Sequence, residues 1–184
     1  MKKVSFFLLG AAFLASSLAF AAPKAPITLA VQSDKSRVDF IGSKAADFHT
    51  GSFTVKGGSV QIEAGKLVGG SFVIDLANLK VTDAAGDRLA GHLKSPDFFD
   101  VAKFGEATYT ISSVDYSSAT ACTINGSLNI KGLSVPVSFA SNIRSASEKG
   151  LFGQAYFSID RTLLGIAYAG PSKDVQIAVH LFAK

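Results

Sequence analysis

The chain has 184 residues, 48% of them hydrophobic, and its 18 basic and 14 acidic side chains give a formal charge of +4. After Lys2 and Lys3 the basic residues stand singly, and no aromatic-rich RNA-binding motif accompanies them, so the composition indicates against a nucleic-acid-binding protein. Cys122 is the only cysteine, which excludes an intramolecular disulfide and leaves stability to a packed apolar core.

The N-terminus has the pattern of a secretory signal peptide. Two lysines precede an apolar run over residues 4–14, and Ala19-Phe20-Ala21 offers the small residues of a cleavage site. We therefore expect residues 1–21 to be removed and residues 22–184 to form one domain. No later segment is continuously apolar over about 18 residues, so we expect an exported, soluble protein.

Apolar and polar residues alternate along most of the remaining chain, as they do in antiparallel strands that bury one face. The alternation predicts about eight strands. Their apolar positions are Val38 and Phe40; Val60 and Ile62; Phe72, Ile74 and Leu76; Tyr109 and Ile111; Ile124, Leu128 and Ile130; Val135, Val137 and Phe139; Phe157 and Ile159; and Val175, Ile177, Val179 and Leu181.

Residue pairs that contain glycine separate the predicted strands and indicate tight turns. One further pair, Asn125-Gly126, has the same alternation on both sides, so it is either a hairpin turn or part of a continuous or bulged strand. Cys122 lies in the same stretch, and we interpret it as a packing residue. The predicted turns are Gly57-Gly58, Gly65-Lys66, Gly69-Gly70, Lys131-Gly132, Lys149-Gly150 and Gly170-Pro171.

Only residues 77–105 interrupt the alternation, and we predict a short helical segment around residues 83–102. Ser95 followed by Pro96 has the form of a helix start. A serine side chain accepts hydrogen bonds from free backbone amides, and a proline at the first helical position loses none.

Three phenylalanines, Phe98, Phe99 and Phe104, lie in this interruption and need an apolar surface to cover. We predict that they plug or cover one end of the protein. The charged residues over positions 92–100 are either a polar collar for a ligand head group or the solvated side of a connecting helix.

About eight strands with one apolar face must stack as a sandwich or close as a barrel, and the strand count alone does not decide between them. The number of apolar positions favours a barrel, and closure would also remove exposed strand edges. An eight-stranded barrel has room for its own side chains or for one small ligand.

Almost the whole chain after the signal peptide resembles the YceI-like family of bacterial polyisoprenoid-binding, lipocalin-like proteins. The segments that carry the resemblance are residues 36–40 with 49–53, 91–100, 126–137 and 159–166. The resemblance implies an all-β, eight-stranded antiparallel lipocalin-like β-barrel in the periplasm. It also implies that the barrel holds a long isoprenoid chain, polyprenyl or isoprenoid quinone, for storage or transport.

The apolar strand positions agree with that function, because Phe, Ile and Val give contact area without hydrogen-bond demands. Candidates for head-group contacts are His49, Arg88 and His92. The predicted contacts to the apolar tail are Phe40, Phe53, Phe72, Ile74, Phe98, Phe99, Phe104, Tyr109, Ile111, Leu128, Ile130, Phe139, Phe157 and Ile159.

The main alternative is a barrel filled by its own side chains, which would serve as a protein-interaction or stress-response module. No catalytic motif is present, and the spacing of His49, His92 and His180 does not match a metal site, so neither an enzyme nor a cofactor is predicted. The expected partners are an isoprenoid lipid and, transiently, a membrane, with the protein as a monomer or homodimer.

Overall fold

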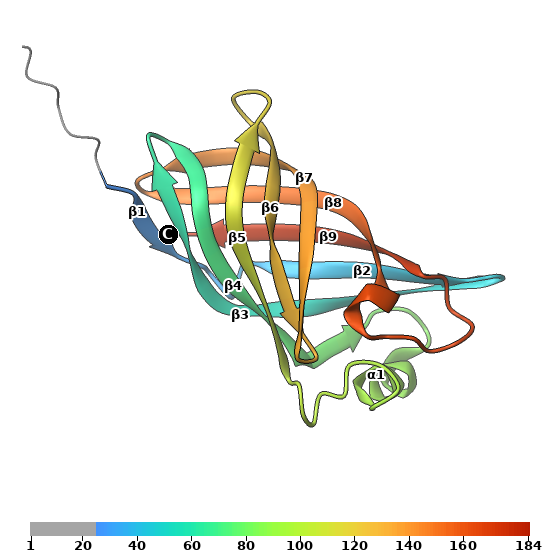
Figure 1. Ribbon diagram of the computed structural model, residues 1–184. Coiled ribbons are helices and arrows are strands. Elements are labelled where there is room, and N and C mark those ends of the chain that lie inside the picture. Colours follow the sequence, from blue (N-terminus) through green and yellow to red (C-terminus); the bar gives the residue numbers. More distant parts are fainter. Residues whose placement is uncertain (1–24) are drawn as a thin grey trace, which may run out of the picture.

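A computed structural model describes residues 25–184, and the predicted signal peptide lies outside them. The strands and helices follow one another in a simple order (Figure 1). They are β1 (Ile27–Ala30), β2 (Arg37–Lys44), β3 (Asp47–Glu63), β4 (Lys66–Val81), α1 (Gly86–Lys94), β5 (Glu106–Tyr116), β6 (Ala121–Ile130), β7 (Leu133–Ser147), β8 (Gly150–Asp160), the 3-10 helix η1 (Arg161–Leu164) and β9 (Asp174–Ala183).

All strand pairs are antiparallel, and β2 to β9 form a closed barrel. The order is β3-β2-β9-β8-β7-β6-β5-β4, and the pairing of β3 with β4 completes the circle. The short strand β1 pairs with the second half of β3, and Val31 bridges to Ala183 at the end of β9. The predicted eight-stranded barrel with one short helix is thereby confirmed.

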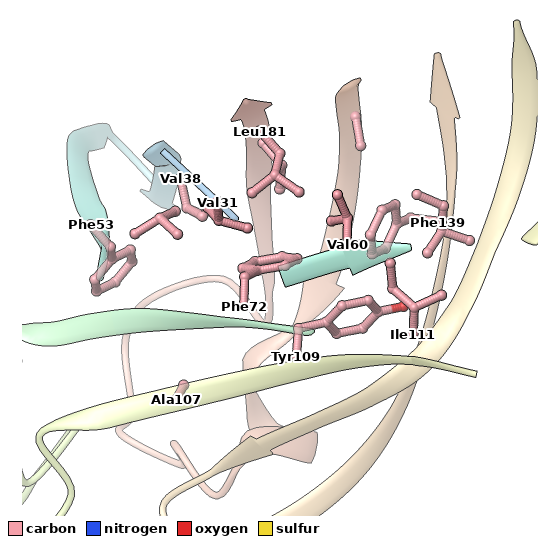
Figure 2. Close-up of a cluster of buried hydrophobic side chains, with 14 of the residues drawn as sticks. Val31, Val38, Phe53, Val60, Phe72, Ala107, Tyr109, Ile111, Phe139 and Leu181 are labelled. Carbon is pink, nitrogen blue, oxygen red and sulfur yellow. The ribbon is translucent and has the colours of Figure 1, made fainter. Parts of the chain in front are cut away.

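The predicted alternation places the apolar core inside the barrel. Figure 2 shows Val38, Val60, Phe72, Tyr109 and Leu181, which come from five different strands, turned toward a common interior. These side chains are at most 7% exposed. A barrel with this inner face needs no second sheet to cover it, which is why closure replaces a sandwich.

Two-residue turns connect four of the hairpins, and in two of these turns both residues have a positive φ. Lys131 and Gly132 have φ of 50° and 75°, the left-handed pair that a tight hairpin between right-twisted strands requires, so that predicted turn is confirmed. The turn between β3 and β4 uses Ala64 and Gly65 in the same conformation, one position earlier than predicted.

The predicted turns at Gly57-Gly58 and Gly69-Gly70 are wrong, because both pairs lie inside long strands. Gly58 of β3 is paired with Phe72 of β4, next to a register shift, and its φ is 135°. A Cβ on Gly58 would lie 2.2 Å from the main-chain oxygen of Ser71. The glycines therefore let the two strands approach and change register without ending.

Asn125-Gly126 belongs to the continuous strand β6, and the register shift lies in the opposing strand β5, between Ile111 and Ser113. A Cβ on Gly126 would lie 2.6 Å from the ring of Tyr109. Gly126 therefore makes room for that ring inside the barrel.

The prediction that Ser95-Pro96 starts a helix is also wrong. Strand β4 continues to Val81, and α1 ends at Lys94, immediately before Ser95. Ser95 is extended, with ψ of 170°, because a residue before proline is disfavoured in the helical conformation. Among residues 25–184, none of the helices has the length and apolar character needed to cross a bilayer.

Cys122 is buried in β6, and burial raises the pKa of its thiol. Because the thiolate is the reactive form, we expect the folded protein to react with iodoacetamide far more slowly than the protein in urea. Mass spectrometry after timed quenching measures both rates. Equal rates with and without urea would contradict a packing role for this residue.

Candidate functional site: the barrel cavity

The barrel interior contains a cavity of about 220 Å³. Each strand from β2 to β9 contributes apolar side chains to its wall, and α1 contributes Leu89 and Leu93. An apolar cavity of about 150 Å³ can already stay dry and take up a small hydrocarbon. The side chains of this barrel therefore leave space that suits an apolar ligand.

One reason for the empty space is a missing side chain. Gly42 of β2 continues the inward phase of Val38 and Phe40, and it lines the cavity. A Cβ on Gly42 would meet no atom within 4 Å. The inward-facing position of β2 at Gly42 therefore leaves part of the barrel interior unfilled.

Twelve of the fourteen predicted tail contacts line the cavity, although their contact with a ligand stays a prediction. Ile111 lines a separate void of about 30 Å³ in the other half of the barrel. Phe104 is half-buried near the turn at Gly132 and does not line the cavity. The twelve are Phe40, Phe53, Phe72, Ile74, Phe98, Phe99, Tyr109, Leu128, Ile130, Phe139, Phe157 and Ile159.

An aromatic row separates the cavity from the smaller void. Phe72, Tyr109 and Phe139 border both spaces, with ring centroids 5.7 Å and 5.4 Å apart along the row (Figure 2). The Tyr109 hydroxyl donates a hydrogen bond of 2.8 Å to the carbonyl of Val137, and burial raises its pKa to about 12. This row is the inner end of the cavity.

The segment after α1 covers part of the opposite end. Phe98 and Phe99 line the cavity, and Phe98 packs against Tyr168 with ring centroids 4.9 Å apart. The Lys131 ammonium donates to the carbonyl of Phe98 and, over 3.2 Å, to that of Gly165. Packing and hydrogen bonds thus join this segment to the loop after η1.

We expect Phe98→Ala combined with Phe99→Ala to lower the free energy of unfolding by about 3 kcal/mol or more and to speed ligand release, because two cavity-wall rings are lost. Urea denaturation and a dissociation-rate measurement test the two effects. Phe104→Ala is the matched control, since this ring belongs to the same segment but not to the cavity wall. A double variant with unchanged stability and release would exclude a covering role.

Apart from Tyr109, the polar side chains that line the cavity lie on one side, between the β2–β3 hairpin and the loop after η1. The hairpin contributes Ser43, Lys44 and His49, and the loop side contributes Arg161 and Ser172. Lys44 and Ser172 are exposed, so the cavity reaches the surface here. We refer to this region as the mouth.

Of the three predicted head-group residues, His49 alone lines the cavity. Its Nδ1 lies 3.3 Å from the Asp83 carboxylate, which also accepts hydrogen bonds from the amides of Ala85 and Thr50. These amide hydrogen bonds, with Ala85 contributing most, lower the pKa of Asp83. A carboxylate therefore orients His49 at the mouth.

The structure places the other two head-group candidates away from the cavity wall. Arg88 is exposed on α1. His92 lies 3.4 Å from the Asp97 carboxylate and packs edge-on against Phe98 and Tyr168. His92 thus contributes to the packing of the covering segment.

Arg161 lines the cavity and organises the neighbouring loop, and it was not among the predicted site residues. Its side chain is only 7% exposed and donates to the carbonyls of Ser172, Ile166, Tyr168 and Pro171 over 2.6–2.9 Å. It therefore shapes the whole loop beside the mouth. The sequence carries one signal for this role, which is a charged residue placed directly after a predicted strand and before the apolar residues of a turn.

The three histidines do not converge. His180 lies on the outer face of β9, 3.1 Å from the Gln154 side chain, whereas His49 and His92 have the partners described above. Within residues 25–184, no three His, Cys, Asp or Glu side chains are grouped so that they could hold a metal ion.

Comparison with known proteins supplies the family context. A family model described as the YceI-like domain matches residues 29–183. The UPF0312 protein VVA0736 of Vibrio vulnificus strain YJ016 is 24% identical over 176 residues, which cover 91% of this chain and 92% of that protein.

Solved structures share the fold. BcnA of Burkholderia cenocepacia has a TM-score of 0.71 at 19% identity, covering 84% of this chain and 99% of BcnA. A polyisoprenoid binding domain from Saccharophagus degradans, implicated in plant cell wall breakdown, has a TM-score of 0.65 at 18% identity. That match covers 85% of this chain and 97% of the domain.

Proposed function

Because the chain belongs to the YceI-like domain family, we propose that its barrel binds a long-chain isoprenoid lipid of the polyprenyl or isoprenoid-quinone type. The cavity carries the proposal: its walls are apolar side chains from eight strands, and its polar lining residues, apart from Tyr109, lie at the mouth. A branched hydrocarbon chain needs such walls, and a polar head group needs such a mouth. The polyisoprenoid-binding description of the Saccharophagus degradans domain supports the same ligand class.

We further propose that the protein stores or transports this lipid in the periplasm, as the N-terminal signal pattern suggests. Transfer of one isoprene unit from water would release roughly 3 to 4 kcal/mol, and eight units would exceed the ~18–21 kcal/mol ceiling of non-covalent binding. A membrane is therefore the relevant source. Exchange between bilayer and cavity is then near balance, which suits a carrier rather than an enzyme.

The experiment is organic extraction and mass spectrometry of protein purified from its native compartment. The expected result is a co-purifying prenyl lipid near one molecule per protein. A second arm offers prenyl lipids in vesicles to the delipidated protein. The absence of lipid in the first arm and of uptake in the second would together overturn the proposal and favour the empty-barrel interaction module.

A further inference from the structure

Exposed apolar side chains gather at the mouth of the barrel. In the part of the chain that the structure describes, six large hydrophobic residues are exposed: Ile41, Phe48, Leu133, Tyr156, Leu163 and Tyr168. Phe48 and Ile41 share the outer face of the β2–β3 hairpin, and Leu163 and Tyr168 belong to η1 and its following loop. Only Tyr156 lies elsewhere, in the middle of β8 on the outside of the barrel.

The loop over residues 161–172 connects these positions. Its Gly165 lies against Leu133, since a Cβ on Gly165 would be 3.1 Å from the Leu133 Cδ1 atom. At its other end the amide of Ser172 donates a 2.7 Å hydrogen bond to the carbonyl of Ser43, and Ser43 is the register partner of Phe48. Phe48, Leu133, Leu163 and Tyr168 thus follow one border of the mouth, which we name the apolar rim.

The same loop leads from the surface into the cavity. Leu164 and Ile166 are buried and line the cavity, whereas the neighbouring Leu163 is 62% exposed and Tyr168, which packs on Phe98 and His92, is still 41% exposed. Figure 1 shows η1 and this loop at the end of the barrel that also carries α1. Apolar side chains are therefore continuous from the outer surface to the cavity wall.

We propose that the apolar rim docks on a phospholipid bilayer, so that an isoprenoid chain passes between membrane and cavity without crossing water. This inference rests on the proposed function. An isoprenoid chain is out of water both in the membrane and in the cavity, so passing through water between them is a free-energy barrier. A rim inserted among the acyl chains removes that barrier.

The charges beside the rim fit phospholipid head groups. Lys44 lies on the same hairpin as Phe48, 3.6 Å from the Asp47 carboxylate, and the exposed Lys173 follows the loop. The Lys131 ammonium is held instead by the carbonyls of Phe98 and Gly165. The long stems of lysines lie along apolar surface while their ammonium groups reach phosphates. The rim residues lie at the end of a hairpin, at the start of a strand and in a loop, so each of these side chains can insert separately into the bilayer surface.

The test compares vesicle binding of two variants in a flotation assay with phosphatidylethanolamine and phosphatidylglycerol. Phe48→Ser combined with Leu163→Ser removes two rim side chains that are 59% and 62% exposed and do not line the cavity. Tyr156→Ser is the matched control, because Tyr156 is 64% exposed and lies outside the rim. We expect the rim variant to lose at least about tenfold in vesicle partitioning, while the control partitions like the wild type.

A second pair of measurements separates docking from ligand binding. Farnesol added without membrane should bind equally to the wild type and the rim variant, whereas transfer of a fluorescent prenyl lipid from vesicles should slow by about tenfold in the variant. Wild-type protein that binds no farnesol but still floats would contradict the proposed function and leave docking intact.

Three results would overturn docking itself. The first is wild-type protein that does not float with vesicles. The second is a rim variant that floats and transfers lipid like the wild type, or a control that loses as much as the rim variant. The third is light scattering in which Phe48→Ser with Leu163→Ser converts a dimer to a monomer without any vesicle binding in the wild type, which would assign the rim to self-association.

Discussion

Gly42→Phe is expected to block the cavity and reduce isoprenoid binding by at least about a hundredfold, equivalent to roughly 2.8 kcal/mol. Gly42 lines the cavity in the same inward phase as Phe40, and a Cβ there would meet nothing within 4 Å. A phenylalanine ring at this position takes the volume that the ligand chain needs. The fold should tolerate it, since an aromatic residue suits a strand better than glycine does.

Gly57→Phe is the matched control for that experiment. Gly57 also lies in a strand with no atom within 4 Å of its Cβ position, but it does not line the cavity. Titration with a fluorescent prenyl lipid compares affinity, and thermal unfolding confirms that both variants are folded. A folded Gly42→Phe variant with wild-type affinity would show that the ligand binds outside this cavity.

Gly58→Ala is expected to lower the free energy of unfolding by about 3 kcal/mol or more, because the substitution combines backbone strain with overpacking. Gly58 has a φ of 135°, and its Cβ would lie 2.2 Å from the Ser71 oxygen and 2.6 Å from the Phe72 Cα. Neither contact is with a flexible side chain. Relief would require the paired strands β3 and β4 to separate where they change register.

The neighbouring Gly57→Ala is its control and should be neutral, or more stable by about 0.4–1 kcal/mol, because alanine restricts the unfolded chain. Urea denaturation of the two variants and the wild type measures the difference. Two variants of equal stability would mean that the strands do not approach at Gly58 as described.

The strand alternation was the reliable guide to the fold, and glycine was not a reliable guide to its turns. Phe40, Tyr109 and Phe139 face the interior as their phase predicts. A residue pair that contains glycine has the same sequence signature in a hairpin turn as in a strand that shifts register beside its neighbour. Only the register of β3 against β4 tells Gly57-Gly58 from Lys131-Gly132.

Strand phase also predicted which side chains face inward, but not how far along the barrel axis they lie. Tyr109 and Ile111 share a phase, yet Tyr109 forms the inner end of the cavity and Ile111 lies beyond it. Likewise, the sequence offers His49 and His92 equally as candidates for head-group contacts. His49 lines the cavity because the β2–β3 hairpin lies at the mouth, whereas His92 does not line it.

The sequence by itself determined the antiparallel strands, the inward apolar face and the interruption between β4 and β5, because the alternation of side chains is a local property of an extended backbone. Tertiary structure decided that Arg161 organises the loop at the mouth and that a cavity remains. A cavity is the volume left over after side chains from eight strands have packed. That volume depends on the positions of all of them together, so no single segment encodes it.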